Sequence, residues 1–139
     1  MITLKEITLD DLEFARKLRN KFKNCFFNQK EIDEETHLDW FNKIQTNNRF
    51  RFFIIWLDKE RIGTISLTDL EKDSEIGNVI IDKKYQGKGY LRQAIDKLLE
   101  KFKNDYRQTF FVKVIPSNQN AILAYQALGF KEKKRTLWI

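Results

Sequence analysis

Two glycines and a lysine stand directly before an apolar helical pattern in the stretch YQGKGYLRQAI, Tyr85 to Ile95. Gly87 and Gly89 are two of only five glycines in the chain of 139 residues. Glycines at this place let consecutive backbone N–H groups converge, and the start of a helix adds free donors and partial positive charge. Lys88 and Arg92 add formal charge. The pattern favours binding of an anion such as a phosphate, and an ordinary tight turn is the alternative.

This loop does not match the usual nucleotide-binding motifs. A Walker loop needs G-x-x-x-x-G-K-[ST], and a dinucleotide-binding loop needs three glycines after the first strand of a βαβ unit. In this chain a strand-like run, NVII, and a short loop lead into Gly87 and Gly89. An anion would therefore be held by a strand–loop–helix junction of another kind.

Three further side chains have types that take part in chemistry in other proteins. His37 is the only histidine, and its helical spacing with Trp40 and Ile44 favours a packed residue over a base. Cys25 is the only cysteine, so no intrachain disulfide is possible and we expect the thiol to be inert. Tyr125 lies in an apolar stripe, which favours a core residue over a proton donor.

The elements that must position these side chains follow from the spacing of apolar residues. Alternating or continuous apolar runs predict strands over Ile2–Thr8, Arg51–Leu57, Arg61–Leu70, Glu75–Ile81, Thr109–Ile115 and Gly129–Ile139. Helical spacing predicts helices over Leu9–Phe22, Ile32–Asn48, Gly89–Lys103 and Ser117–Leu128. The expected N-cap residues are Asp10 or Asp11, Asp33, and Ser117 or Asn118.

The order of these elements, β-α-α-β-β-β-α-β-α-β, predicts an α/β (α+β) fold with a mixed central sheet flanked by helices. Strand–helix–strand units near the C-terminal end are the basis for the parallel part of the sheet. No Pro- or Gly-rich linker divides the chain. We therefore expect a single domain over residues 1–139.

Composition limits the classes of function. The chain is 42% hydrophobic and 33% charged, with a net charge of +6, and its basic residues are scattered. This balance suits a phosphorylated ligand and gives little support to nucleic-acid binding. No apolar run is long enough to span a membrane, and the N-terminus lacks the order of a secretory signal. We expect a cytoplasmic protein without a membrane partner.

A second motif lies downstream of the glycine loop, in NQNAILAYQALGF, Asn118 to Phe130. Strand, Q-x-x-G, helix, strand and then N-x-x-A-x-x-x-Y-x-x-x-G-F resembles the Gcn5-related N-acetyltransferase (GNAT) superfamily. The resemblance covers residues from about Glu75 to Phe130, and the strand–helix–helix–strand start is similar as well. One departure is Leu91, where the family usually has Gly or Ala, so the loop beside the pyrophosphate would be wider.

The resemblance implies acetyl-CoA as co-substrate and no metal. A strand beside a splayed neighbour would bind the pantetheine arm, and the glycine loop would bind the pyrophosphate. The cofactor-binding residues that the resemblance implies are Val79, Ile80, Ile81, Gln86, Gly87, Lys88, Gly89, Tyr90, Leu91, Arg92, Asn118 and Tyr125.

The resemblance also implies catalytic roles. An N–H near Val79 would stabilise the oxyanion that forms when an amine attacks the thioester. Tyr125 would protonate the departing thiolate. The amine must be neutral to attack, and Glu75, His37 or a chain of water molecules would serve as the base.

The acceptor is expected to meet the N-terminal half. Its R-N pair, Phe-rich turn and EE-x-HL-x-WF pattern resemble acetyltransferases that modify nucleotide-linked deoxyamino sugars for surface glycans. The implied substrate-binding residues are Arg19, Asn20, Phe26, Phe27 and His37. An amino-sugar nucleotide is the predicted small-molecule acceptor. A ribosomal-protein type N-terminal acetyltransferase is the alternative, and a basic binding module without catalysis is a third. Homodimerisation is left open.

Overall fold

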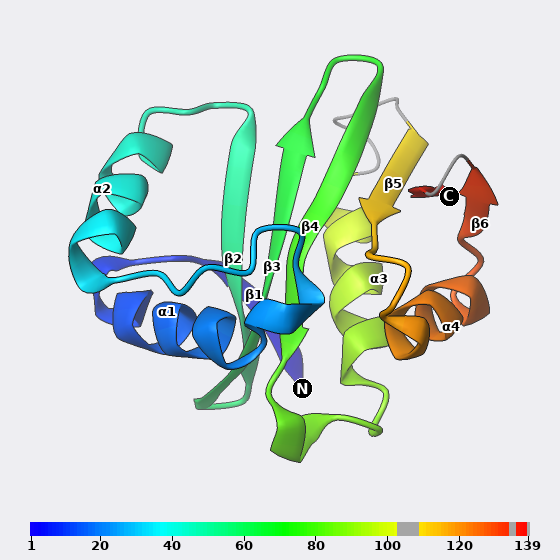
Figure 1. Ribbon diagram of the computed structural model, residues 1–139, viewed down its shortest axis with the longest axis horizontal. Helices are drawn as coiled ribbons and strands as arrows, with labels where there is room; N and C mark the ends of the chain where they lie inside the picture. The colour runs from blue at the N-terminus through cyan, green and yellow to red at the C-terminus, as the bar shows by residue number, and fades with distance from the viewer. Residues whose placement is uncertain (103–108, 134–135, 139) are drawn as a thin grey trace.

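The computed structural model describes residues 1–102, 109–133 and 136–138, and these form one mixed sheet with helices on both faces (Figure 1). The strands are β1 (Ile2–Glu6), β2 (Phe50–Leu57), β3 (Glu60–Asp69), β4 (Asp73–Ile81), β5 (Thr109–Lys113), β6 (Lys131–Lys133) and β7 (Thr136–Trp138). The α-helices are α1 (Leu12–Lys21), α2 (Glu34–Ile44), α3 (Tyr90–Phe102) and α4 (Gln119–Ala127). Short 3-10 turns cover Leu9–Asp11, Lys23–Cys25 and Lys83–Tyr85. The predicted fold class is confirmed, and the element order holds up to the last strand.

The strand order in the sheet is β1-β2-β3-β4-β5-β7-β6. β4 and β5 pair in parallel, and every other neighbouring pair is antiparallel. The two strands of a parallel pair need a crossover, and α3 lies in this one. The glycine loop therefore lies where β4 leaves the sheet for the crossover helix.

The C-terminal end differs from its prediction. A single strand was expected over Gly129–Ile139, whereas the structure has two, β6 and β7, paired antiparallel from Lys131 with Trp138 to Lys133 with Thr136. Residues 134, 135 and 139 lie outside the described residues. The run KEKKR has no apolar alternation that would hold one long strand against a core. A hairpin edge fits this polar sequence better.

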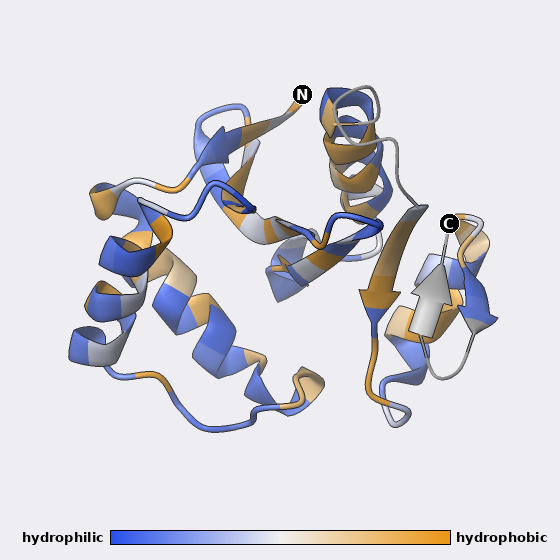
Figure 2. Cartoon of the chain, turned by 90° about the horizontal axis from the view of Figure 1, so that it is seen from above, coloured by the Kyte–Doolittle hydropathy of each residue, from blue (hydrophilic) through white to orange (hydrophobic). Residues whose placement is uncertain are grey.

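The apolar run in β2 is buried on both faces of the sheet. Phe53 and Ile55 belong to the core cluster that includes α3, while Phe52 and Ile54 belong to the cluster with α1 and α2. Successive residues of a strand point to opposite faces, so a strand covered on both sides reads as continuous rather than alternating. Figure 2, seen from above, shows the α1–α2 pair and α3 on opposite sides of the sheet.

Two of the predicted helix caps are found, and at the third Asp11 occupies the predicted N-cap position without a capping bond to α1. The Asp33 carboxylate accepts from the Thr36 N–H at 2.7 Å, and Asn118 accepts from the Ala121 N–H at 3.3 Å. At the first helix no aspartate side chain caps α1. Asp11 instead accepts from the backbone N–H and the hydroxyl of Thr8, because a 3-10 turn precedes α1 and starts one turn earlier.

None of the described helices has the length and apolar character needed to cross a membrane.

Candidate active site

A cavity of about 870 Å³ opens where β4 and β5 part. Their pairing runs from Asp73 with Thr109 to Ile76 with Val112 and goes no further within the described residues. The cavity is lined by β4 from Glu75 onward, by the end of β5, by the glycine loop, by α4, and by the segment after α1. Segments that are far apart in the sequence, including both motifs, therefore meet around one hollow.

The glycine loop forms one end of this cavity. Gly87 and Gly89 have φ values of +76° and +83°, which side chains with a Cβ rarely adopt. Within the described residues, the backbone N–H groups of Gly87, Lys88 and Gly89 have no hydrogen-bond acceptor. The N–H of Gln86 differs, because it donates to the Lys83 carbonyl, and the Gln86 side chain donates to the Ile81 carbonyl at 2.8 Å. The free donors of the loop thus begin at Gly87.

Most of the predicted cofactor-binding residues line the cavity. Those that do so are Val79, Ile80, Ile81, Gln86, Gly87, Gly89, Tyr90, Leu91, Asn118 and Tyr125. Leu91 is half-buried and packs against the core below the loop. Lys88 and Arg92 are exposed and lie outside the lining, so they contribute positive charge from the rim.

Tyr125 projects from α4 into the cavity lining and is only 5% exposed. Its ring packs edge-on against Phe130, with the ring centroids 5.7 Å apart. Burial raises the pKa of the Tyr125 phenol above its ordinary value of 10, because the charged phenolate would lose its solvation. The hydroxyl therefore keeps its proton at every physiological pH.

The segment that follows α1 also lines the cavity. Glu75 lines it from the start of β4, and Phe22, Phe26 and Phe27 line it from the segment. Cys25 lines it as well and is exposed. Glu75 is the one carboxylate among the described residues that line the cavity.

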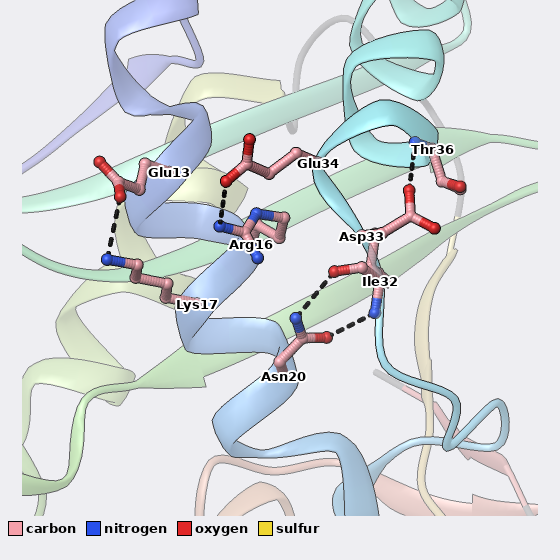
Figure 3. A network of polar contacts seen from close by, with 8 residues as sticks. All are labelled: Glu13, Arg16, Lys17, Asn20, Ile32, Asp33, Glu34 and Thr36. Atoms are coloured by element: carbon pink, nitrogen blue, oxygen red, sulfur yellow. Dashed lines mark hydrogen bonds and ion pairs between the residues drawn. The ribbon is translucent and has the colours of Figure 1, made fainter.

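Arg19 and Asn20 lie outside the cavity lining, and both hold the segment that carries the phenylalanines. The Arg19 guanidinium lies 3.7 Å from the centre of the Phe26 ring and donates to the Asn28 carbonyl. The Asn20 amide donates to the Ile32 carbonyl and accepts from the Ile32 N–H, as Figure 3 shows. Partial burial lowers the pKa of Arg19. Both residues therefore hold in place the segment that lines the cavity.

His37 lies away from the cavity, on α2. It is buried and stacks on Trp40, with ring centroids 4.9 Å apart and planes within 10°. Burial, with the nearby Arg16 charge, lowers the pKa of His37 below its ordinary value. This arrangement agrees with the packed reading of its sequence pattern.

The lowered pKa of His37 predicts a pH-dependent stability. In the unfolded chain His37 binds a proton with its ordinary pKa of 6.5, whereas in the folded protein the pKa of His37 is lower. The free energy of unfolding should therefore fall as the pH drops below about 7, with a component due to His37. His37→Phe keeps an aromatic ring on Trp40 and removes this component. Urea unfolding measured at several pH values should give the shallower dependence for the variant, and parallel curves would contradict the assignment.

Several site residues had no clear signal in the sequence. Phe22 and Cys25 reach the cavity only because the segment after α1 folds back over β4. Asn78 has a φ of +51° inside β4, and the Gly-Asn pair within EIGNVII is the kind of interruption that marks a β-bulge. That bulge could have been predicted.

No group of three or more His, Cys, Asp or Glu side chains that could hold a metal is found among the described residues.

Comparisons with known proteins agree with this geometry. A family model described as the acetyltransferase (GNAT) family matches residues 15–130. An uncharacterized N-acetyltransferase of Methanocaldococcus jannaschii is 25% identical over 143 residues. That match covers 95% of this chain, and the chain spans 62% of the relative's length.

Solved structures are similar over nearly the whole chain. A spermidine N-acetyltransferase from Vibrio cholerae, in complex with CoA and spermine, has a TM-score of 0.87 and 22% identity, covering 99% of this chain and 94% of that chain. A domain from Methanocaldococcus jannaschii has a TM-score of 0.83 and 22% identity, covering 99% and 96%. At this identity the two structures establish the likeness of the fold alone.

Proposed function

The chain belongs to the acetyltransferase (GNAT) family, and we propose that it transfers an acetyl group from acetyl-CoA to a primary amine. One observation carries the proposal: β4 and β5 part over a cavity that is lined by a loop of free N–H groups and by aromatic rings of the segment after α1. A long, extended donor with a phosphorylated end fits such a hollow. A short acceptor would bind beside the aromatic rings.

The residues present fit acetyl-CoA. Beyond Ile76, the side of β4 that faces β5 has no strand partner among the described residues, so Val79 to Ile81 can bind an extended amide chain. The N–H groups of Gly87 to Gly89 and the start of α3 suit a pyrophosphate. A Cβ built on Gly87 or Gly89 meets no protein atom within 4 Å, so the space beside the loop is open.

Acetyl-CoA supplies the acetyl group as a thioester, and three groups of this chain would assist its transfer. The Val79 N–H would donate to the carbonyl oxygen as negative charge develops there. The Tyr125 hydroxyl would donate its proton to the departing sulfur. Glu75, directly or through water, would take the proton from the amine. His37 is buried against Trp40 and lies outside the cavity lining, which favours Glu75 as the base.

We propose an amino group on a nucleotide-linked sugar as the acceptor. Phe22, Phe26 and Phe27 offer ring faces for a sugar or a base, and Phe27 is 67% exposed with no packing role that would require its ring. Structural relatives are spermidine acetyltransferases. A polyamine is a polycation, however, and the described residues supply this cavity with one carboxylate, Glu75, in a chain of net charge +6. The charge favours a neutral or anionic acceptor.

A turnover screen tests the function. Release of CoA thiol from acetyl-CoA should be measured with UDP-linked 4-amino-4,6-dideoxy sugars, the free amino sugars, spermidine, and peptides with free N-termini. Preference for the nucleotide-linked sugar would support the proposal. Acetylation of peptides alone would favour an N-terminal acetyltransferase, and turnover of spermidine alone would refute the charge argument. A protein that binds no CoA would be a binding module without catalysis.

The salt dependence of the reaction gives a separate prediction. Exposed phosphate contacts are screened over a Debye length of about 8–10 Å near physiological ionic strength. The KM for a sugar-nucleotide acceptor should therefore rise as salt is added, whereas the KM for the matching free sugar should change little. Steady-state kinetics at saturating acetyl-CoA measure both. Equal salt dependence of the two acceptors would show that the nucleotide is not recognised.

A further inference from the structure

A β-bulge interrupts β4 where it borders the cavity. Gly77 pairs with Ser66 and Ile80 pairs with Thr64, so Asn78 and Val79 together face a single residue of β3. Asn78 has a φ of +51°. The other described non-glycine residues with positive φ, Asp58 and Glu71, lie in hairpin connections rather than inside a strand. The bulge therefore holds a strained conformation in the middle of the sheet.

Two buried hydroxyl groups of β3 hold this bulge. The Thr64 hydroxyl donates to the Asn78 carbonyl oxygen at 2.6 Å. The Asn78 side-chain amide donates to the Ser66 hydroxyl oxygen at 2.9 Å. Thr64 and Ser66 are each 1% exposed. Buried hydroxyls are costly unless they are hydrogen-bonded, and both of these bonds go to one residue.

The backbone of β3 is shaped to the same bulge. A Cβ on Gly63 would lie 2.2 Å from the carbonyl oxygen of Ile80, so only glycine lets β3 approach that end of the bulge. A Cβ on Gly77, at the other end, would lie 3.2 Å from the Ser66 hydroxyl oxygen. The bulge is thus fitted closely at both ends.

We propose that Thr64 and Ser66 are positioning residues that aim the Val79 N–H into the cavity. In a trans peptide the C=O and the N–H point in opposite directions. Thr64 holds the Asn78 carbonyl toward β3, so the N–H of the same peptide, that of Val79, points away from β3. The next strand on that side is β5, from which β4 has parted to form the cavity. This inference rests on the proposed acetyl transfer, in which Val79 is the oxyanion donor.

The first test replaces the Thr64 hydroxyl by a methyl group of similar size. Thr64→Val should lower kcat by roughly 10–100-fold, below the ~10²–10³-fold loss for removing an oxyanion-hole donor outright, because the N–H is misdirected and not deleted. The KM for acetyl-CoA should change far less, since the glycine loop is unchanged. Thr64→Ser keeps the donor and should restore most of kcat. Thr68→Val, on the same strand outside the bulge, is the control for loss of a hydroxyl.

The second test addresses the backbone of Asn78. Asn78→Gly loses the bond to Ser66 but adopts a positive φ freely, whereas Asn78→Ala loses the bond and disfavours that φ. The glycine variant should therefore keep more of kcat than the alanine variant. Equal loss in both would show that the conformation of Asn78 is not what matters.

A readout without substrate separates this inference from the proposed function. In the ligand-free protein, NMR should show that Thr64→Val shifts the Val79 amide resonance and alters the φ-dependent coupling of Asn78, while Thr68→Val does neither. An unchanged Val79 amide, or wild-type kcat in a folded Thr64→Val protein, would overturn the positioning role and leave the acetyltransferase proposal standing. A wild-type protein that acetylates no amine would refute the proposed function instead, and the NMR result would still decide whether Thr64 orients the peptide.

Discussion

Replacing Tyr125 by phenylalanine is expected to lower kcat by about 10²-fold, the low end of the ~10²–10⁴-fold range for general acid–base catalysis. The low end is expected because a thiolate is a fair leaving group. Phenylalanine keeps the ring and its packing on Phe130, and it removes the hydroxyl. The affinity for acetyl-CoA and the melting temperature should therefore change little.

The pH profile and a second tyrosine make this test specific. Because burial raises the pKa of Tyr125, its phenol stays protonated as the pH rises, and kcat should not fall from its ionisation near the ordinary value of 10. Tyr85→Phe is the matched control, since the Tyr85 hydroxyl donates to Glu60. If Tyr125→Phe retains full kcat where the chemical step limits turnover, Tyr125 is a core residue and no more.

Replacing Gly89 by valine is expected to weaken CoA binding at least about tenfold. A left-handed conformation costs a residue with a Cβ roughly 1–2 kcal/mol, so the free loop of the variant should relax to another conformation. Restoring the binding conformation would then cost that energy, and about 1.4 kcal/mol corresponds to a tenfold change in affinity. The φ of Gly89 is +83°, so valine would be strained there. Its side chain would also occupy the open space beside the loop, where a Cβ meets no protein atom within 4 Å. A phosphate in that space would be displaced.

Calorimetry of CoA binding measures this effect, and thermal unfolding reports on the fold. Gly129→Val is the matched control, because Gly129 has a φ of +98° after the end of α4 and is not a lining residue of the cavity. It should lower the melting temperature and disturb CoA affinity much less. Unchanged affinity in a folded Gly89→Val protein would remove the phosphate-binding role of the loop.

The sequence was sufficient for the elements whose signals are local. Apolar spacing located α2 and α3, the cap Asp33 follows from its type, and Asn118 is one of the two expected caps of α4. The apolar run within Arg51 to Leu57 predicted a strand, and the structure has β2 there. The prediction of a single last strand was wrong, because the sequence pattern of Lys131 to Trp138 is consistent with either one extended segment or two. Only pairing with a neighbour distinguishes them.

The site was predictable where the family motifs are continuous in sequence. The glycine loop, Asn118 and Tyr125 meet around the cavity as their motifs imply. The roles of Thr64 and Ser66 were not predicted, because the sequence does not show which residue of the next strand a hydroxyl group will bond. Arg19 and Asn20 were expected at the substrate, but they bond the backbone of their own segment. Such roles depend on contacts that sequence spacing does not encode.

The unpaired side of β4 has a consequence for handling the protein. Unpaired strand edges recruit other extended chains, and most proteins keep them short, charged or covered at the border of a sheet. Here such an edge lies inside the sheet, from Gly77 to Ile81, where the described residues supply no strand on the β5 side. Protein stripped of ligand should exchange these amide hydrogens quickly and aggregate sooner on storage. Saturation with CoA should slow both processes, because the ligand takes the place of the missing strand.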